Sequence, residues 1–236
     1  MNCLLIEEAE LDRATGRAKL AGRRRQHAEE ILRARVGDSL RVGLIGGELG
    51  TGRILNLDRE VLELDVSIQH APPAKLPLRL VIALPRPPVF RRLLSTIASL
   101  GVERLLVVGT ARTEKSFWQS HVLEPAQIRS RLLLGIEQAR DTILPETTMH
   151  RYFESLVDEI LPSWVDQRRS FVAHPGAETE CPHDVDEPVT LFIGPEGGFI
   201  DHEIDRLVGI GFEPIGLGER ILRVEPVIPM LVGRLF

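Results

Sequence analysis

Residues 189–199 read V-T-L-F-I-G-P-E-G-G-F, an apolar, β-prone run followed by three glycines and a proline. Asp201, His202 and Glu203 then open a helical pattern, so the glycines lie at a predicted turn between a strand and a helix. Adjacent glycines permit positive φ angles and let a ligand approach bare backbone amides. Open α/β sheets bind ligands at the carboxyl ends of their strands. The stretch therefore predicts a ligand-binding turn, with a plain tight turn as the simpler interpretation.

A second glycine-containing turn lies near the end of the chain. Residues 216–226 read G-L-G-E-R-I-L-R-V-E-P; they follow a predicted strand at 214–217 and lead into a short helix beginning near Pro226. We expect the two turns to border one pocket. Its expected apolar lining is Leu217, Ile221 and Leu222, and its expected charged groups are Arg223 and Glu225. The simpler interpretation is an acid favoured by the helix dipole and an ordinary surface arginine.

Two familiar phosphate-binding patterns are missing from the sequence. It contains neither G-x-x-x-x-G-K-[ST] nor G-x-G-x-x-G. A P-loop and a standard dinucleotide-binding motif are therefore excluded, and the glycine turns belong to another kind of site.

The larger part of the chain alternates between predicted strands and helices. The strands are expected at 78–84, 104–109, 147–150, 170–173, 189–193 and 214–217, and the helices at 89–100, 125–140 and 151–161. In the helix at 125–140, Ile128, Leu132, Ile136 and Ala139 share the apolar side. Such alternation is typical of an α/β fold with a mostly parallel sheet and helices on both faces.

The first part of the chain has a different pattern, with strands expected at 3–7, 39–45, 51–57 and 61–68. A helix between the first two would carry Ala28, Ile31, Leu32 and Val36 on one apolar side. Residues 70–77 read H-A-P-P-A-K-L-P, and their prolines favour extended backbone. We therefore predict a small β domain at 1–70, a linker at 71–77 and an α/β domain at 78–236.

Composition is that of a soluble globular protein, with 43% apolar and 27% charged residues in 236. No apolar run approaches the roughly 18 residues of a membrane helix, and the start of the chain does not resemble a signal peptide. With only Cys3 and Cys181, far apart in the sequence, we expect a cytoplasmic protein without a membrane partner.

The net charge of −5 hides a strong segregation. Residues 86–140 carry nine basic and four acidic side chains, whereas residues 141–205 carry three and fifteen. A further basic cluster runs from Arg13 to Arg25 without an acid between them. Such a cluster is typical either of phosphate binding or of a solvated surface.

The two glycine turns together resemble a known signature. L-F-I-G-P-E-G-G-F at 191–199, followed by L-G-E-R-I-L-R-V-E at 217–225, is similar to the paired motif of the small-subunit ribosomal RNA uridine N3-methyltransferase family, in the SPOUT or trefoil-knot class. R-R-R-Q-H-A-E-E-I-L-R-A-R-V-G-D at 23–38 resembles the family's N-terminal region. The resemblance implies an N-terminal PUA-like β-barrel, a C-terminal trefoil knot, S-adenosylmethionine as methyl donor, 16S rRNA of the small ribosomal subunit as substrate, and a homodimer.

The resemblance also implies roles for particular residues. The cofactor would be held by Ile193, Gly194, Pro195, Glu196, Gly197, Gly198, Leu217, Gly218, Arg220, Ile221 and Leu222. Arg223 and Glu225 would be catalytic, with Arg223 toward the RNA and either Glu196 or Glu225 at the cofactor or assisting proton removal. RNA would be bound by Arg23, Arg24, Arg25, His27, Arg33, Arg35, Arg86, Arg91 and Arg92. No metal is implied.

The chain departs from the family pattern at two places. A turn that is often lysine-glycine reads L-P-R-P-P-V-F-R-R at 84–92, and Pro226 replaces a hydroxyl residue that could cap the last helix. The alternative function is therefore a non-catalytic RNA-binding or ribosome-assembly factor with the same fold. A zinc site at His174, Cys181 and His183 is disfavoured, because their spacing fits no standard pattern.

Overall fold

A computed structural model describes residues 2–236 of the chain. Contacts divide it into two compact units: Met1–Ala74 with Leu133–Leu144, and Lys75–Leu132 with Pro145–Phe236. The predicted second domain had included residues 133–144, which instead group with the first unit. The division into two domains with a linker at 71–77 stays a prediction.

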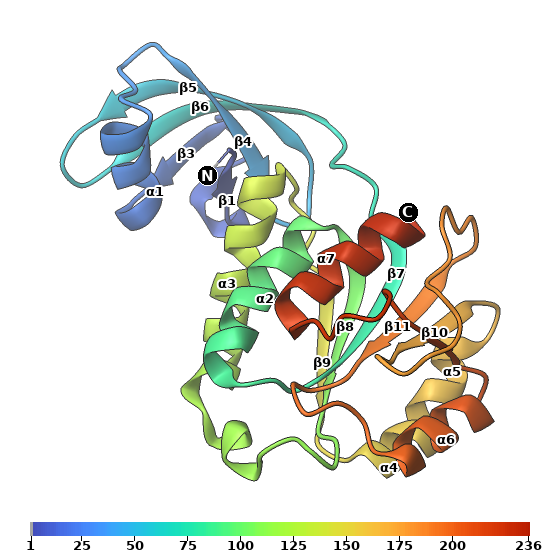
Figure 1. Cartoon of the computed structure of the whole chain (residues 1–236). Helices are drawn as coiled ribbons and strands as arrows, with labels where there is room; N and C mark the ends of the chain where they lie inside the picture. Colours follow the sequence, from blue (N-terminus) through green and yellow to red (C-terminus); the bar gives the residue numbers. More distant parts are fainter. Residues whose placement is uncertain (1) are drawn as a thin grey trace. The chain divides into compact units, whose positions relative to one another are not determined.

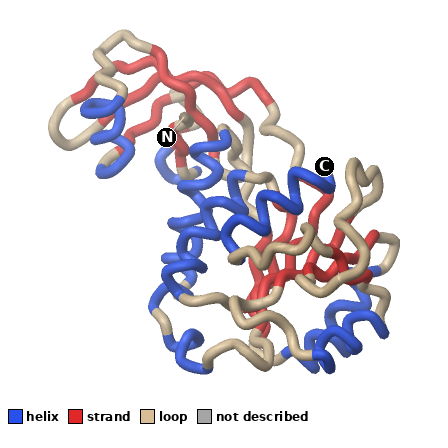
Figure 2. The backbone as a smooth tube through the Cα atoms, viewed as in Figure 1, coloured by secondary structure: helices blue, strands red, loops and turns tan. Residues whose placement is uncertain are grey.

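The first unit contains a six-stranded sheet in the order β1-β4-β5-β6-β3-β2 (Figures 1 and 2). Its strands are β1 (Leu4–Ile6), β2 (Leu11–Asp12), β3 (Arg17–Leu20), β4 (Ser39–Leu44), β5 (Leu49–Leu57) and β6 (Leu62–His70). β1 pairs with β4 in parallel, and the other pairs are antiparallel. β1 and β2 form the two ends of this order, so it does not by itself show a closed barrel.

Four strands of this sheet lie close to their predicted positions, but β2 and β3 were not predicted. The hairpin loop between β4 and β5 is also shorter than expected, because β5 already begins at Leu49. Both differences have the same cause. Short, charged or glycine-rich segments lack a strong alternation, and their place in the sheet is fixed by pairing with neighbours.

The helix of the first unit is shorter than predicted. α1 (Gly22–Gln26) continues as one π-helical turn, η2 (His27–Ile31), and Arg33 then takes a left-handed φ of 52°. The wider π turn rotates later side chains away from the core side. Ala28 is buried, but Ile31, Leu32 and Val36 are 67%, 45% and 62% exposed, so the predicted apolar side was wrong beyond Ala28.

The second unit contains a six-stranded, fully parallel sheet in the order β12-β10-β11-β7-β8-β9. The strands are β7 (Leu76–Ala83), β8 (Val102–Val108), β9 (Glu146–His150), β10 (Arg169–Ala173), β11 (Val189–Ile193) and β12 (Glu213–Ile215). The predicted α/β fold with a parallel sheet is therefore confirmed. β11 has the predicted bounds and pairs with β10 on one edge and β7 on the other. All five of its residues are buried.

Helices connect these strands. They are α2 (Pro87–Ser99), α3 (Pro125–Ala139), α4 (Phe153–Ser155), α5 (Leu161–Val165), α6 (Asp201–Gly209) and α7 (Val224–Leu235), with the π-helical turn η5 (Leu156–Ile160) between α4 and α5 and the short 3-10 helices η3 (Lys115–Gln119) and η4 (His121–Leu123) before α3. α2 starts with two prolines, whose missing N–H groups a helix start leaves unpaired anyway, and ends before Gly101 with φ 77°.

The core of the second unit explains how the helices are arranged. Val81, Val172 and Phe192 on one face of the sheet pack with Phe153 and Leu207, which come from α4 and α6. α2 and α7 contact each other and lie together away from α4, α5 and α6 (Figure 1). Alternate strand residues thus meet helices on both faces. Within residues 2–236 no helix is both long and apolar enough to cross a membrane.

Candidate active site

Three neighbouring strands end at one pocket. β10, β11 and β12 are adjacent and parallel, so their carboxyl ends lie at the same edge of the sheet. The pocket there has a volume of about 250 Å³. Both glycine turns contribute to it, as predicted: the lining includes Ile193, Gly194, Pro195, Glu196, Gly198, Leu217, Gly218, Arg220, Ile221, Leu222 and Arg223. Of the predicted cofactor-binding and catalytic residues, Gly197 and Glu225 do not line it.

The first turn is shaped by contacts that only glycine permits. A Cβ atom on Gly194 would lie 3.0 Å from the ring of Phe199, which is buried under the turn. Gly198 has φ 70°, and its N–H donates to the Pro195 carbonyl over 2.8 Å. The turn is therefore closed by its own backbone, and a glycine is required where the chain becomes left-handed.

Gly197 faces Arg112 instead of the pocket. A Cβ at this position would lie 3.2 Å from Cδ of Arg112, whose guanidinium donates to the Gly197 carbonyl over 2.5 Å. Arg112 belongs to the loop that follows β8. No local sequence pattern indicates this contact, because the two residues are 85 positions apart.

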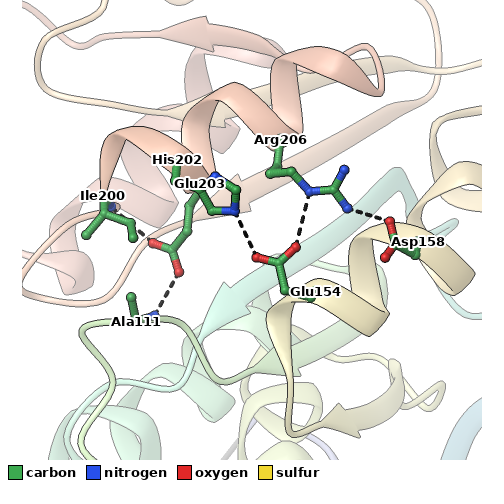
Figure 3. Close-up of polar contacts among 7 residues, drawn as sticks. All are labelled: Ala111, Glu154, Asp158, Ile200, His202, Glu203 and Arg206. Atoms are coloured by element: carbon green, nitrogen blue, oxygen red, sulfur yellow. Dashed lines mark hydrogen bonds and ion pairs between the residues drawn. The ribbon is translucent and has the colours of Figure 1, made fainter.

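A buried carboxylate connects that loop to the start of α6 (Figure 3). Glu203 is only 2% exposed. Its carboxylate accepts hydrogen bonds from two backbone N–H groups, that of Ala111 over 2.7 Å and that of Ile200 over 3.1 Å. Ile200 is the N-cap of α6, so Glu203 also satisfies a free donor of the helix start. Arg112 and Glu203 together fix the side of the first turn that faces away from the pocket.

The second turn begins with backbone pairing to the loop after β10. The N–H of Gly216 donates to Thr179 over 2.9 Å, and the Gly216 carbonyl accepts the N–H of Cys181 over 2.9 Å. Gly218 then takes φ 92°, and no atom lies within 4 Å of a Cβ built there. The first residues of the loop after β10, His174 and Pro175, line the pocket as well.

The last helix begins at Val224, with Arg223 as its extended N-cap residue. Pro226 occupies the first turn, where a missing N–H costs no helical hydrogen bond, so this departure from the family pattern fits the fold. Pro229 lies inside the helix and cannot donate to the Glu225 carbonyl.

The charged groups of the second turn have separate surroundings. Arg223 is exposed and lines the pocket. Glu225 forms an ion pair with Arg92 of α2, with 2.7 Å between the Arg92 nitrogen and the carboxylate oxygen. The hydrogen bond from Arg92 lowers the pKa of Glu225, which makes this carboxylate a weaker base. Glu196 lines the pocket, and its Oε1 accepts the backbone N–H of Arg86 over 3.1 Å.

His174 is a pocket residue whose position there the sequence interpretation missed. It follows β10 directly and lines the pocket with Pro175. Within residues 2–236 its Nδ1 atom is buried and has no hydrogen-bond partner. Buried polar atoms are normally paired, so this unpaired nitrogen is an exception among the described residues. Its place right after a strand of the parallel sheet was the signal that could have revealed it.

The predicted RNA-binding arginines of the first unit are largely engaged in ion pairs. Arg23 pairs with Glu137 over 2.7 Å, and Arg24 with Glu10 over 2.5 Å. The Arg25 side chain is nearly buried, donates to the Asp58 carbonyl over 2.6 Å and pairs with Glu29. Burial and these two partners leave the Arg25 guanidinium little surface for RNA, and its role in RNA binding stays a prediction.

The other predicted RNA-binding residues are more accessible. Arg33 and Arg35 are exposed after η2, and His27 is half-buried. In the second unit Arg86 and Arg91 are exposed, whereas Arg92 is engaged with Glu225. Their role in RNA binding stays a prediction.

The cysteine and histidine loop after β10 does not form a metal site in the described part of the chain. Within residues 2–236 no three His, Cys, Asp or Glu side chains gather closely enough to hold an ion. Cys181 is buried, which raises the pKa of its thiol, whereas His183 is exposed.

Comparison with known proteins defines the class to which this fold and pocket belong. Residues 72–234 match a family model described as an RNA methyltransferase domain. The chain belongs to this RNA methyltransferase family, and the match spans both glycine turns and all six strands of the parallel sheet.

Named relatives are similar over nearly the whole chain. The ribosomal RNA small subunit methyltransferase E of Treponema pallidum is 29% identical over 234 residues, which cover 95% of this chain and 86% of the relative. Its counterpart in Borreliella burgdorferi, ribosomal RNA small subunit methyltransferase E 1, is 24% identical over 230 residues, covering 95% and 93%. The predicted resemblance to small-subunit rRNA methyltransferases is thereby confirmed.

Solved structures share the fold of the full chain. The ribosomal RNA small subunit methyltransferase E of Neisseria gonorrhoeae, bound to S-adenosyl methionine, superposes with a TM-score of 0.76 at 18% identity, covering 98% of this chain and 95% of that one. A putative methyltransferase of Legionella pneumophila, in complex with the same cofactor, gives 0.74 at 23% identity over the same shares.

Proposed function

We propose that the chain transfers a methyl group from S-adenosylmethionine to N3 of a uridine in 16S rRNA of the small ribosomal subunit. The observation that carries the proposal is the single pocket shared by both glycine turns in a member of an RNA methyltransferase family. The names of the relatives support small-subunit rRNA as the substrate. Solved neighbours with bound S-adenosylmethionine support the cofactor.

The residues of the pocket fit such a cofactor. Gly194 and Gly198 expose backbone, and Leu222 offers an apolar surface. Ile221 lines the same pocket although it is 84% exposed, so a ligand would cover an apolar side chain that otherwise faces water. When bound, S-adenosylmethionine supplies a methyl group on an electrophilic sulfonium.

Arg223 is the residue we assign to the nucleotide. N3 of uracil must lose its proton before it can act as a nucleophile, and the resulting negative charge spreads over the ring. Arg223 lines the pocket from the N-cap position of α7, and its guanidinium can stabilise that negative charge.

The two candidate carboxylates are assigned to positioning. Glu225 orients Arg92 through their ion pair, and its lowered pKa argues against a role in accepting the proton. Glu196 lines the pocket, and its carboxylate accepts a hydrogen bond from the backbone N–H of Arg86, the N-cap residue of α2. Glu196 is therefore the better candidate for a cofactor contact.

Several broader features complete the proposal. By family resemblance we propose a trefoil knot; the loop after β10 pairs with Gly216 and then contacts the end of α7, where the Val185 N–H donates to the Leu235 carbonyl over 2.7 Å. By family resemblance we also propose that the first unit is a PUA-like barrel that binds RNA, that residues 71–77 are a linker, and that the protein works as a cytoplasmic homodimer.

Labelled methyl transfer tests the function directly. Purified protein and S-adenosylmethionine with a labelled methyl group are incubated with small ribosomal subunits from a strain that lacks this modification, and the labelled base is mapped by mass spectrometry. We expect label at N3 of a uridine in 16S rRNA. A protein that binds the cofactor and the subunits but transfers no label would instead be an RNA-binding or assembly factor.

A further inference from the structure

A second pocket lies entirely within the first unit. It has a volume of about 240 Å³ and is lined by the start of the chain, by Leu32 after η2, by the first residues of β4 and by Arg140, which follows α3. Two arginines therefore line it, Arg41 from β4 and Arg140. Neither was singled out by the sequence, because no cluster of basic residues surrounds them.

Neither guanidinium group of this pocket is engaged in an ion pair with a described carboxylate. Within residues 2–236 neither Arg41 nor Arg140 has an ion pair or a side-chain hydrogen bond, in contrast to Arg23, which already engages Glu137. Arg41, Glu137 and Arg140 all act electrostatically on Cys3, which lines the same pocket, and Glu137 is already paired with Arg23. Burial raises the pKa of Cys3 to about 12, so this thiol stays neutral and offsets neither charge.

The backbone of Arg140 has an unusual conformation. Its φ is 60°, and the following N–H of Asp141 donates to Ile136 over 2.9 Å, which is the usual left-handed end of a helix. Glycine is preferred at such a position, and another residue costs roughly 1–2 kcal/mol. A positive charge is favoured near the C-terminus of a helix. A residue in the last turn of α3 could carry that charge with ordinary helical backbone, without the cost of a left-handed φ. We therefore infer that the Arg140 side chain contributes something at this position that offsets the backbone cost.

An apolar surface completes the pocket. Leu32 lines it while 45% exposed, and Leu40 lines it from β4. Two free guanidinium groups beside an apolar surface match the chemistry of a nucleotide, since arginine binds phosphate through paired N–H groups and a base can pack on an aliphatic side chain.

We propose that this pocket binds one unpaired nucleotide of the RNA substrate, with its phosphate on Arg41 and Arg140 and its base against Leu32. The proposal rests on the proposed function only in taking RNA as the ligand. It also moves the RNA contact of the first unit away from Arg23, Arg24 and Arg25, whose charges are paired with carboxylates of the same unit.

Binding of a short single-stranded RNA, followed by fluorescence anisotropy over a range of salt concentrations, tests the proposal. The variants are Arg41→Gln and Arg140→Gly; glycine suits the left-handed backbone at 140, so the second variant should fold at least as well as the wild type. Arg59→Ala is the control, because it removes one exposed arginine of the same unit that does not line the pocket.

We expect each pocket variant to weaken RNA binding about 3- to 10-fold and to reduce the salt slope by about 0.7 for each lost phosphate contact. Variants that bind RNA like Arg59→Ala would overturn the proposal. Uridine monophosphate is titrated in parallel, and affinity equal to that of the RNA would overturn the assignment to a polymer. Methyl transfer by the wild type is measured separately, so failure of the proposed function is distinguished from failure of this pocket.

Discussion

Removing the carboxylate of Glu203 is predicted to destabilise the second unit and to loosen the cofactor pocket. In Figure 3 this side chain joins Ala111 to Ile200, which lie on different loops. A hydrogen bond to a charged group contributes about 1.5–3 kcal/mol, and both hydrogen bonds here are only partly buried, which favours the lower end. We therefore expect Glu203→Ala to lose roughly 3 kcal/mol and Glu203→Gln, which keeps one acceptor, about half of that.

Thermal unfolding and cofactor titration measure the two effects together. A loss of roughly 3 kcal/mol corresponds to a fall in Tm of about 6–12 °C for a unit of this size. Cofactor affinity should also fall, because Glu203 anchors the loop that carries Arg112, the partner of Gly197. Glu154→Ala is the matched control: Glu154 pairs with His202 and Arg206 on the same face, yet its side chain is 56% exposed.

Exposed ion pairs contribute about 0–1 kcal/mol, so the control should lower Tm only slightly and leave cofactor binding unchanged. If Glu203→Ala and Glu154→Ala had equal effects on Tm, the argument from burial would be refuted. If Glu203→Ala lowered stability but left cofactor affinity intact, the proposed link between this carboxylate and the first glycine turn would be wrong.

Three further predictions concern the pocket and its edge. Arg223→Ala should leave cofactor affinity within about twofold while methyl transfer falls roughly 100-fold or more, because the guanidinium acts on the nucleotide; unchanged turnover would remove that role. Gly197→Val should abolish cofactor binding without unfolding the chain, since its side chain would displace Arg112, and calorimetry together with circular dichroism decides it. Glu225 has a pKa below its ordinary 4.5 in the folded state, so its contribution to stability is present above that pH and is lost as the pH falls through the lowered value. The stability difference between wild type and Glu225→Gln should therefore shrink in acid, and a difference that grew on acidification would contradict the sign.

Much of the parallel sheet could be predicted from local pattern. The apolar run at Val189–Ile193 has the bounds of β11, and the glycines after it lie at a strand end. Buried parallel strands are continuous apolar runs, so they are visible without knowledge of their neighbours. The shared pocket followed from one further rule, that parallel strands present their carboxyl ends at a common edge.

The remaining features depend on contacts between distant residues. Arg112 meets Gly197, and Glu203 meets Ala111, across separations of 85 and 92 positions that no local pattern encodes. Likewise, the run of three arginines indicated a nucleic-acid surface, whereas each of these side chains is paired inside the first unit. A charge run shows where charge is, and only the fold shows whether it is already compensated.

Titration with S-adenosylmethionine by calorimetry tests most directly whether the two glycine turns form one cofactor site. Gly218→Ala adds a methyl group at a left-handed position that lines the pocket, whereas Gly211→Ala makes the same change at φ 101° after α6, outside it. Both should cost a similar 1–2 kcal/mol of backbone strain. We predict binding by the wild type and by Gly211→Ala, and at least about tenfold weaker binding by Gly218→Ala. No binding by the wild type, or equal affinity in both variants, would contradict the account.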